Sequence, residues 1–351
     1  RFIRFAARIA VENQPVEQWS TKALSEKDPL TAALAMIALS RQGHASLQPY
    51  IIKALNRIDL SKTDEVTTLA ALRAYALCLT RMRADDMVTI SDTGIPQGVV
   101  NGMINRLDPL LPSKSDNING ELVRLLVYLE SPTIIEKGLA LLHDAKPSAI
   151  PDWAELIKRN AGYGGTIAKM LANYPPQAKI NYTLMLRNVQ DGWTLDQRRD
   201  YFGFINEAGT YNGGNQYASF LGYIREDALA HCTDEEKAAL KDLTDKSLVK
   251  AVEFEITETH PVDTPWTVAS AEALINERGL KGRDFKNGRN AYHAVSCVLC
   301  HQFDGVGGAI GPDLTTVSGK FSIRDLLEAI IEPSAVISDQ YNSSMVTMKN
   351  G

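Results

Sequence analysis

Hydrophobic residues recur at intervals of three and four along almost the whole of residues 1 to 250. A helix has 3.6 residues per turn, so this spacing places the apolar side chains on one helical face. The alternation with a period of two that marks a half-buried strand is nearly absent from the same stretch. The pattern predicts an all-α fold for this part of the chain.

Local signals divide the stretch into short helices. Asp28-Pro29 has the form of an N-cap followed by a first-turn proline, and Gly43 marks the end of the same helix. Two pairs have the spacing of capping boxes, Thr194 with Gln197 and Thr233 with Glu236. Helices this short are marginal alone, so each needs a neighbour that covers its apolar face.

Helical pairs of roughly forty residues that follow one another without a strict sequence period are typical of α-solenoids of the HEAT or armadillo kind. We therefore expect residues 1–250 to form such a solenoid. A compact helical bundle is the alternative, because it would bury the same amphipathic faces.

The helical spacing ends in the segment VEFEITETHPVDTPWT, from Val252 to Thr267, which is rich in threonine and proline. We expect a linker over residues 251–268. A new helical pattern runs from Ala269 to Gly279 and opens a second domain, residues 269–351.

The second domain contains Cys297-Val298-Leu299-Cys300-His301, a CxxCH motif, which is typical of c-type haem attachment. Two thiols one helical turn apart can reach the two vinyl groups of one haem, and the adjacent histidine then presents its imidazole to the iron. The motif predicts one covalently bound haem c, attached through Cys297 and Cys300, with His301 as a ligand of the iron.

Two other uses of a CxxC pair are alternatives to haem. A zinc site needs four ligands, and a histidine next to Cys300 is poorly placed to close the same tetrahedron. A thioredoxin-like dithiol needs a βαβ setting, which the sequence lacks. The remaining cysteines, Cys78 and Cys232, lie in an apolar helical pattern and at a helix junction, where buried and unreactive thiols are expected.

The residues around the motif resemble those of small class I cytochromes c. Gly288 and Tyr292 precede the motif with four-residue spacing, and Gly311-Pro312 follows it. The resemblance implies that the glycine and the aromatic residue lie where an N-terminal helix crosses a C-terminal helix. It also implies that the carbonyl group of Pro312 accepts a hydrogen bond from the imidazole of His301 and so fixes the orientation of the ring.

Three segments after Asp191 carry a closer resemblance: GWTLDQRRDYFGFIN, GGNQYASFLGYIREDALA and GRDFKNGRNAYHAVSCVLCHQFDGVGGAIGPDLTTVSGKFSIRDLLEAIIEPSAVISDQY. They resemble the haem-binding multidomain proteins of the planctomycete and verrucomicrobial (PVC) group. The resemblance implies helical repeats before a terminal cytochrome, often with a β-propeller similar to sugar dehydrogenases further upstream. Any dehydrogenase activity would then belong to an upstream part.

An electron-transfer haem needs a second axial ligand, commonly methionine. Met345 and Met348 are the only methionines after the motif, but their segment SSMVTMKNG has the pattern of a strand that enters a hairpin. The family resemblance places the methionine in a later Met-Pro segment, so we expect the distal ligand beyond Gly351 and the cytochrome domain to be incomplete. We expect His260 and His293 to be surface residues.

Composition and charge exclude several classes of protein. The net charge of -5 is spread along the chain, so no extended basic surface is available for nucleic acid. The sequence has no run of about eighteen apolar residues that could span a membrane.

Covalent haem attachment implies the periplasm or the cell surface. The abrupt ends, without a recognisable signal peptide, predict a fragment of a longer protein.

Two weaker features have simpler interpretations. Arg283, Lys286 and Arg289 form a basic edge before the motif that could meet a redox partner or haem propionates, but a solvated helix face is the favoured explanation. The glycine-rich stretches at 161–166 and 209–217 follow no strand, as a phosphate-binding loop should. Helix caps and turns account for them.

These features together favour electron transfer, in which the haem accepts electrons from a dehydrogenase domain or partner and passes them to another carrier. The solenoid would position the haem. Two alternatives are a haem enzyme or sensor with an open sixth coordination site, and an interaction scaffold in which the haem is secondary.

Overall fold

The structure is a computed structural model that describes residues 2–82, 95–145, 171, 173–213, 216–248, 265–304, 306–308, 311–337 and 347. Within these residues the protein consists almost entirely of helices, so the predicted all-α class is confirmed. The chain divides into two compact units. The N-terminal unit contains the elements up to α13, and the C-terminal unit contains those from α14 onward.

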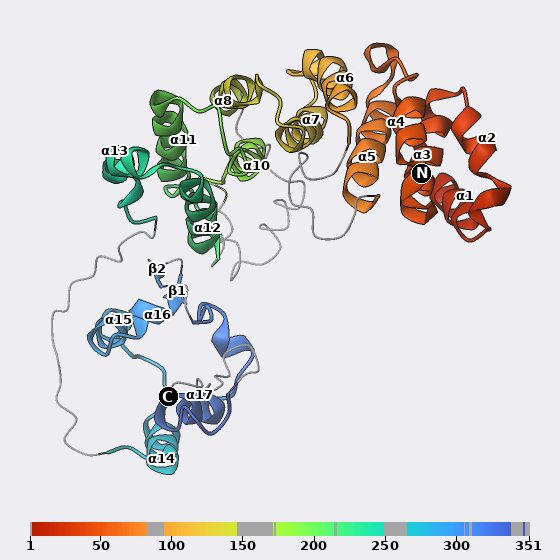
Figure 1. Ribbon diagram of the computed structural model, residues 1–351. Helices are drawn as coiled ribbons and strands as arrows, with labels where there is room; N and C mark the ends of the chain where they lie inside the picture. Colours follow the sequence, from red (N-terminus) through yellow and green to blue (C-terminus); the bar gives the residue numbers. More distant parts are fainter. Residues whose placement is uncertain are drawn as a thin grey trace. The chain divides into compact units, whose positions relative to one another are not determined.

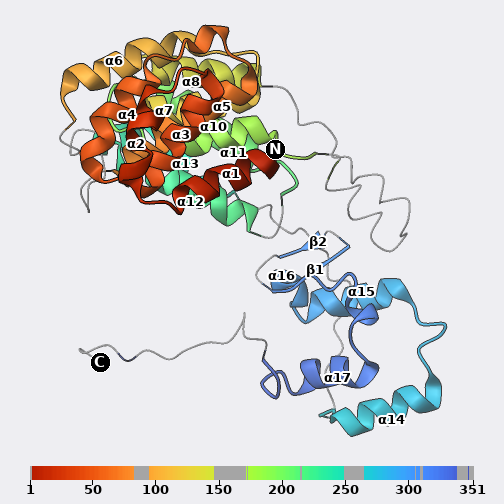
Figure 2. The ribbon, with the colours of Figure 1, turned by 90° about the vertical axis from the view of Figure 1, so that its right-hand side faces the viewer.

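The helices of the N-terminal unit follow one another in a row in chain order, which Figure 1 shows from the side and Figure 2 from its N-terminal end. The α-helices described in this unit are α1 (Phe2–Glu12), α2 (Ser20–Ser25), α3 (Pro29–Gln42), α4 (Gln48–Leu55), α5 (Glu65–Arg81), α6 (Gln97–Leu107), α7 (Asp116–Tyr128), α8 (Ile134–Asp144), α10 (Gln177–Leu186), α11 (Leu195–Ala208), α12 (Tyr217–Ala230) and α13 (Asp234–Thr244). Short 3-10 helices lie between them, namely η1 (Val16–Gln18), η2 (Ala45–Leu47), η3 (Leu60–Lys62) and η5 (Asp108–Leu110).

Each helix of this unit packs against helices that are near it in the sequence. Helix α3 contacts α5, α5 contacts α7, α7 contacts α10, and α11 contacts α13. These contacts enclose one continuous apolar core, whose largest fully buried side chains include Tyr75, Tyr182, Tyr201 and Phe202. Local contacts of this kind bury the amphipathic faces that the sequence spacing predicted.

The helix ends agree with the local signals in the sequence. The carboxylate of Asp28 accepts a hydrogen bond from the backbone N–H of Thr31 and caps α3, which ends at Gln42 before Gly43. The two predicted capping boxes are both present, Thr194 with Gln197 at α11 and Thr233 with Glu236 at α13. Side chains thus satisfy backbone groups that a helix terminus leaves without partners.

The described C-terminal unit contains short helices and one two-stranded hairpin. Its elements are α14 (Val268–Arg278), α15 (Phe285–Ala294), α16 (Cys297–Cys300), β1 (Gln302–Phe303), β2 (Val306–Gly307), η7 (Val317–Gly319) and α17 (Ile323–Ile331). Helix α14 begins one residue before the predicted position, with Thr267 as its N-cap, and ends at Gly279, whose φ is +68°. Most of the predicted linker, residues 251–264, lies outside the described residues.

None of the described helices combines the length and the apolar composition that a transmembrane span requires.

Candidate functional site

The CxxCH motif occupies one helical turn and the residue that follows it. Helix α16 runs from Cys297 to Cys300, and the backbone N–H of His301 donates to the carbonyl of Cys297 at 2.9 Å. The preceding residue, Ser296, has a φ of +63°, in the left-handed region, so α15 does not continue into α16. Helix α16 contacts α15.

The chain after the motif is hydrogen-bonded back onto it. Strands β1 and β2 form an antiparallel hairpin in which Gln302 pairs with Gly307. The backbone N–H of Gly308 donates to the carbonyl of Val298 at 2.7 Å, and that of Gly311 donates to the carbonyl of Cys300, also at 2.7 Å. The hairpin and the loop that follows it therefore fix the position of the motif.

The imidazole of His301 is oriented by the Gly311-Pro312 segment. Its Nδ1 lies 2.9 Å from the carbonyl oxygen of Pro312. A carbonyl can only accept, so Nδ1 is the donor in this contact, and in the neutral ring the lone pair then lies on Nε2. Gly311 lies against the ring, because a Cβ at this position would be 2.7 Å from Cε1 and 2.8 Å from Nδ1 of His301.

A tyrosine connects α15 to the motif. The hydroxyl of Tyr292 donates to the backbone carbonyl of His301 at 2.5 Å, and the Tyr292 ring lies beside that of His293. Partial burial raises the pKa of Tyr292, and nearby Cys297 acts in the same direction. The residue that the cytochrome resemblance singled out thus contacts the motif directly.

The two thiols of the motif differ from the other two in exposure. Cys297 is half-buried and Cys300 is exposed, whereas Cys78 and Cys232 are buried, as predicted. Burial raises the pKa of Cys78 to about 12 and also raises that of Cys232. A thiol that resists ionisation is a poor nucleophile and metal ligand, so chemistry is confined to the motif pair.

The zinc alternative gains no support from the described residues. None of them forms a cluster of three or more histidine, cysteine or acidic side chains with metal-binding geometry. No disulfide joins Cys297 to Cys300 either.

The described C-terminal unit exposes much apolar surface. Only three of its apolar side chains are buried, Val268, Ala271 and Val298. Helix α17 carries five leucine and isoleucine side chains, and none of its residues is buried. Val295 and Leu299, which flank the cysteines, are 70% and 53% exposed. A flat apolar group such as a porphyrin would cover surface of this kind, and the donor set of two thiols and an oriented imidazole fits such a group.

The structure also tests two expectations about which residues near the motif are exposed. His293 is buried, so its prediction as a surface residue was wrong; it lies on α15, which packs against α16. Arg283, Lys286 and Arg289 are exposed, as a solvated helix face requires.

Three candidate residues fall outside the described part of the chain. They are Met345 and Met348, which were considered as distal ligands of the iron, and His260 of the predicted linker. The glycine-rich stretch at 161–166 is also outside it, while Gly209 of the second stretch is the C-cap of α11.

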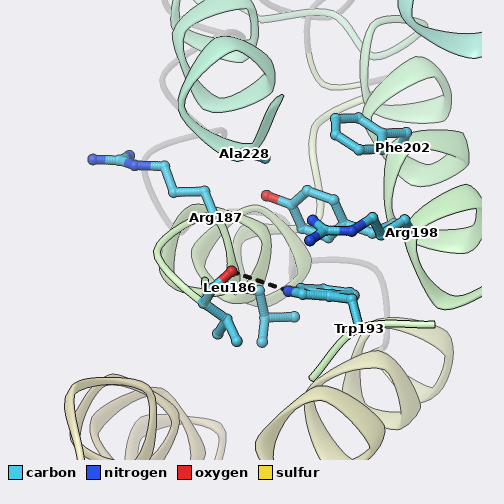
Figure 3. A pocket seen from close by; sticks show the side chains of 8 residues that line it. Leu186, Arg187, Trp193, Arg198, Phe202 and Ala228 are labelled. Atoms are coloured by element: carbon cyan, nitrogen blue, oxygen red, sulfur yellow. Dashed lines mark hydrogen bonds between the residues drawn. The ribbon is translucent and has the colours of Figure 1, made fainter. Parts of the chain in front are cut away.

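An aromatic pocket in the N-terminal unit was not apparent from the sequence. Trp193, Tyr201 and Phe202 line it together with Arg187 and Arg198, as Figure 3 shows. The indole N–H of Trp193 donates to the carbonyl of Val189 at 3.0 Å.

The buried arginine in this pocket has a structural role. The guanidinium of Arg198 lies 5.6 Å from the Trp193 ring, donates from Nε to Glu236 at 2.9 Å, and donates from Nη2 to the carbonyl of His231 at 2.8 Å. The remaining space is too narrow for a water molecule. The pocket therefore joins α11 to α13 and offers no room for a ligand.

Comparisons with models of protein families, with curated proteins and with solved structures found no match to this chain. An assignment of function therefore depends on the motif and its geometry.

Proposed function

We propose that the chain carries one haem c, attached through thioethers to Cys297 and Cys300, with His301 as the proximal ligand, and that it transfers electrons. The observation that carries the proposal is the contact between Nδ1 of His301 and the carbonyl of Pro312. It leaves Nε2 available to iron and gives the ring the fixed orientation that haem ligation requires.

The residues of the site have separable tasks. Cys297 and Cys300 hold the group through one helical turn, and the hairpin of β1 and β2 holds that turn in place. The Pro312 carbonyl keeps the His301 proton on Nδ1 and increases the basicity of Nε2. When bound, the haem supplies a one-electron redox couple. The exposed apolar side chains of α17 and of the motif would shield such a group from water.

The arrangement of the helices supports a proposal for the two domains as well. We propose that residues 1–250 form a HEAT- or armadillo-like solenoid, because the described helices follow one another in a row and pack on neighbours in the sequence. A compact bundle would bring the first and last helices of the unit together, and the described helices make no substantial contact of that kind. We propose that residues 269–351 belong to a class I-like cytochrome domain.

The resemblance to PVC-type haem proteins supplies the wider setting. In this setting the chain is the cytochrome module of a larger dehydrogenase-type protein in the periplasm or at the cell surface, and it exchanges electrons with a partner protein or domain. Covalent haem attachment supports that location.

The proposal can be tested by expressing the full chain with a c-type cytochrome maturation system. Intact mass should increase by one haem in the wild type and in Cys232→Ala, and should not increase in Cys297→Ala/Cys300→Ala. Cys232→Ala is the matched control, because it removes a buried thiol outside the motif.

The spectrum and metal content of the product separate the alternatives. In a protein extended beyond Gly351 to include the expected distal ligand, a low-spin haem with reversible one-electron reduction supports electron transfer. A high-spin haem that turns over peroxide in that longer protein would replace electron transfer with a haem enzyme that has an open sixth site. Zinc without haem would overturn the whole assignment.

A further inference from the structure

The N-terminal unit contains a second cavity, far larger than the aromatic pocket. It lies between α8, α10 and α11, whose positions in the row Figure 1 shows, and its volume is about 250 Å³. Leu139 and Leu142 of α8 and Phe204 of α11 form an apolar wall, and all three are buried. Charged side chains surround this wall.

Each ionisable side chain that lines the cavity lies beside a side chain with which it can form a hydrogen bond or an ion pair. Nε2 of His143 lies 2.7 Å from Oδ2 of Asp200. Lys179 lies 3.9 Å from Glu207, and its ammonium group is 5.3 Å from the centre of the Phe204 ring.

The arginine of the cavity is also paired. Arg199 donates through both terminal nitrogens to the carboxylate of Asp242, at 2.7 and 3.0 Å. An ionic ligand would have to compete with these pairs. A neutral ligand would not, because paired carboxylates keep free lone pairs, and lysine and arginine keep free N–H groups.

A glycine keeps the cavity open. Gly203 lies inside α11 and lines the cavity, and a Cβ at this position would have no heavy atom within 4 Å. Glycine is unfavourable inside a helix relative to alanine. The absence of a side chain at residue 203 leaves the space beside α11 open.

We propose that this cavity binds one ring of an uncharged saccharide. A sugar ring has an apolar face of C–H groups, which matches the wall of Leu139, Leu142 and Phe204, and a rim of hydroxyls that both donate and accept. The paired groups around the wall offer acceptors and donors side by side. The volume is below the roughly 300 Å³ at which drug-sized pockets begin, so it suits a single ring. This site is independent of the proposed haem.

The test uses the full chain and saturation-transfer NMR. The probes are the uncharged methyl glycosides of glucose, galactose, mannose, fucose and N-acetylglucosamine, with acetate and leucine as charged probes. At least one glycoside should bind saturably to the wild type. Gly203→Leu, which places a side chain in the cavity, should weaken that affinity at least tenfold.

The matched control is Gly222→Leu in α12, where a Cβ also has no heavy atom within 4 Å. It should bind the glycoside like the wild type. Both variants replace glycine by a better helix former, and circular dichroism confirms that they fold. The chain with Cys297→Ala/Cys300→Ala should also bind the glycoside like the wild type, because the proposed saccharide site does not involve the haem. The two proposals can therefore fail independently. Binding of only the charged probes, binding of no glycoside, or equal affinity in Gly203→Leu would each overturn it.

Discussion

At the scale of single residues, Gly311 determines how the candidate iron ligand is held. A Cβ on residue 311 would lie 2.7 Å from one ring atom of His301 and 2.8 Å from another, so the ring or the loop must move. The hydrogen bond from His301 to the Pro312 carbonyl depends on that close approach. The lack of a side chain at Gly311 is therefore part of the site.

We expect Gly311→Ala to lower the free energy of unfolding of the haem-loaded chain by about 1–3 kcal/mol, as overpacking generally does. Weakening of the Pro312 contact makes the imidazole less basic, which favours ferrous over ferric iron. The midpoint potential should therefore rise, as redox titration would show. Gly319→Ala is the control, since a Cβ there meets nothing within 4 Å. An unchanged potential in Gly311→Ala would show that the contact does not orient an iron ligand.

Two adjacent arginines of α11 should differ sharply in their contribution to stability. The side chain of Arg198 is 7% exposed and pairs with Glu236, whereas that of Arg199 is 39% exposed and pairs with Asp242. Loss of a buried partner leaves a charge without compensation, at a cost of about 3–5 kcal/mol. An exposed pair contributes about 0–1 kcal/mol.

We therefore expect Arg198→Ala to destabilise the N-terminal unit by about 3 kcal/mol or more, and Arg199→Ala by less than about 1 kcal/mol. Urea unfolding followed by far-ultraviolet circular dichroism measures both. Similar losses in the two variants would contradict the role given to the buried guanidinium.

At the scale of helices, Asp108 joins α6 and η5 to the start of α8. Its carboxylate accepts hydrogen bonds from Ser131, from Thr133 and, at 2.6 Å, from Nζ of Lys137. Partial burial acts to raise the pKa of this carboxyl, but the hydrogen bonds outweigh burial and hold the pKa below its ordinary value of 3.8.

Because the folded-state pKa is lowered, the stability that ionised Asp108 contributes is present at neutral pH. It is lost as the pH falls below the ordinary value and through the lowered folded value. We expect Asp108→Asn to lower the free energy of unfolding by about 2 kcal/mol at pH 7, where charge-assisted bonds are lost. The difference from the wild type should shrink as the pH approaches 2. A difference that stayed constant down to that pH would contradict this account.

Helix boundaries could be predicted where the signal is local. The cap at Asp28, the capping boxes at Thr194 and Thr233, and the stop at Gly279 each involve residues within three or four positions of one another. Such contacts form in the isolated segment, so the sequence contains the whole signal. The hairpin after the motif was missed, although Asp304 and the glycine that follows it are a hairpin turn pair.

The parts of the candidate sites that depend on distant contacts could not be predicted. The CxxCH motif marks Cys297, Cys300 and His301 by itself, and the cytochrome resemblance supplied Pro312. The saccharide cavity has no such signal, because His143 and Asp200 are 57 residues apart and meet only when α8 packs on α11. The burial of His293 was likewise not predicted, because it depends on how α15 packs in the folded unit, and the left-handed φ of Ser296 after that helix is one that residue preferences do not favour.

At the scale of the whole molecule, the two units differ in how their cores are filled. The described N-terminal unit encloses a continuous core with many fully buried side chains, so we expect it to fold without any added group. The described C-terminal unit buries three apolar side chains and leaves those of α17 half-buried or exposed. Burial of apolar area is the main favourable term in folding, so the two units should depend differently on haem.

We expect amide hydrogen exchange to show this difference between the two units. In the haem-loaded chain, α15, α16 and α17 should be protected, whereas in Cys297→Ala/Cys300→Ala they should exchange at close to unfolded rates. Helices α3, α5 and α7 should be equally protected in both, since their core lies in the other unit. Full protection of α17 without haem would mean that another partner covers its apolar face. A loss of protection in α3 would mean that the units fold as one, which would make the helical row part of the haem domain rather than its support.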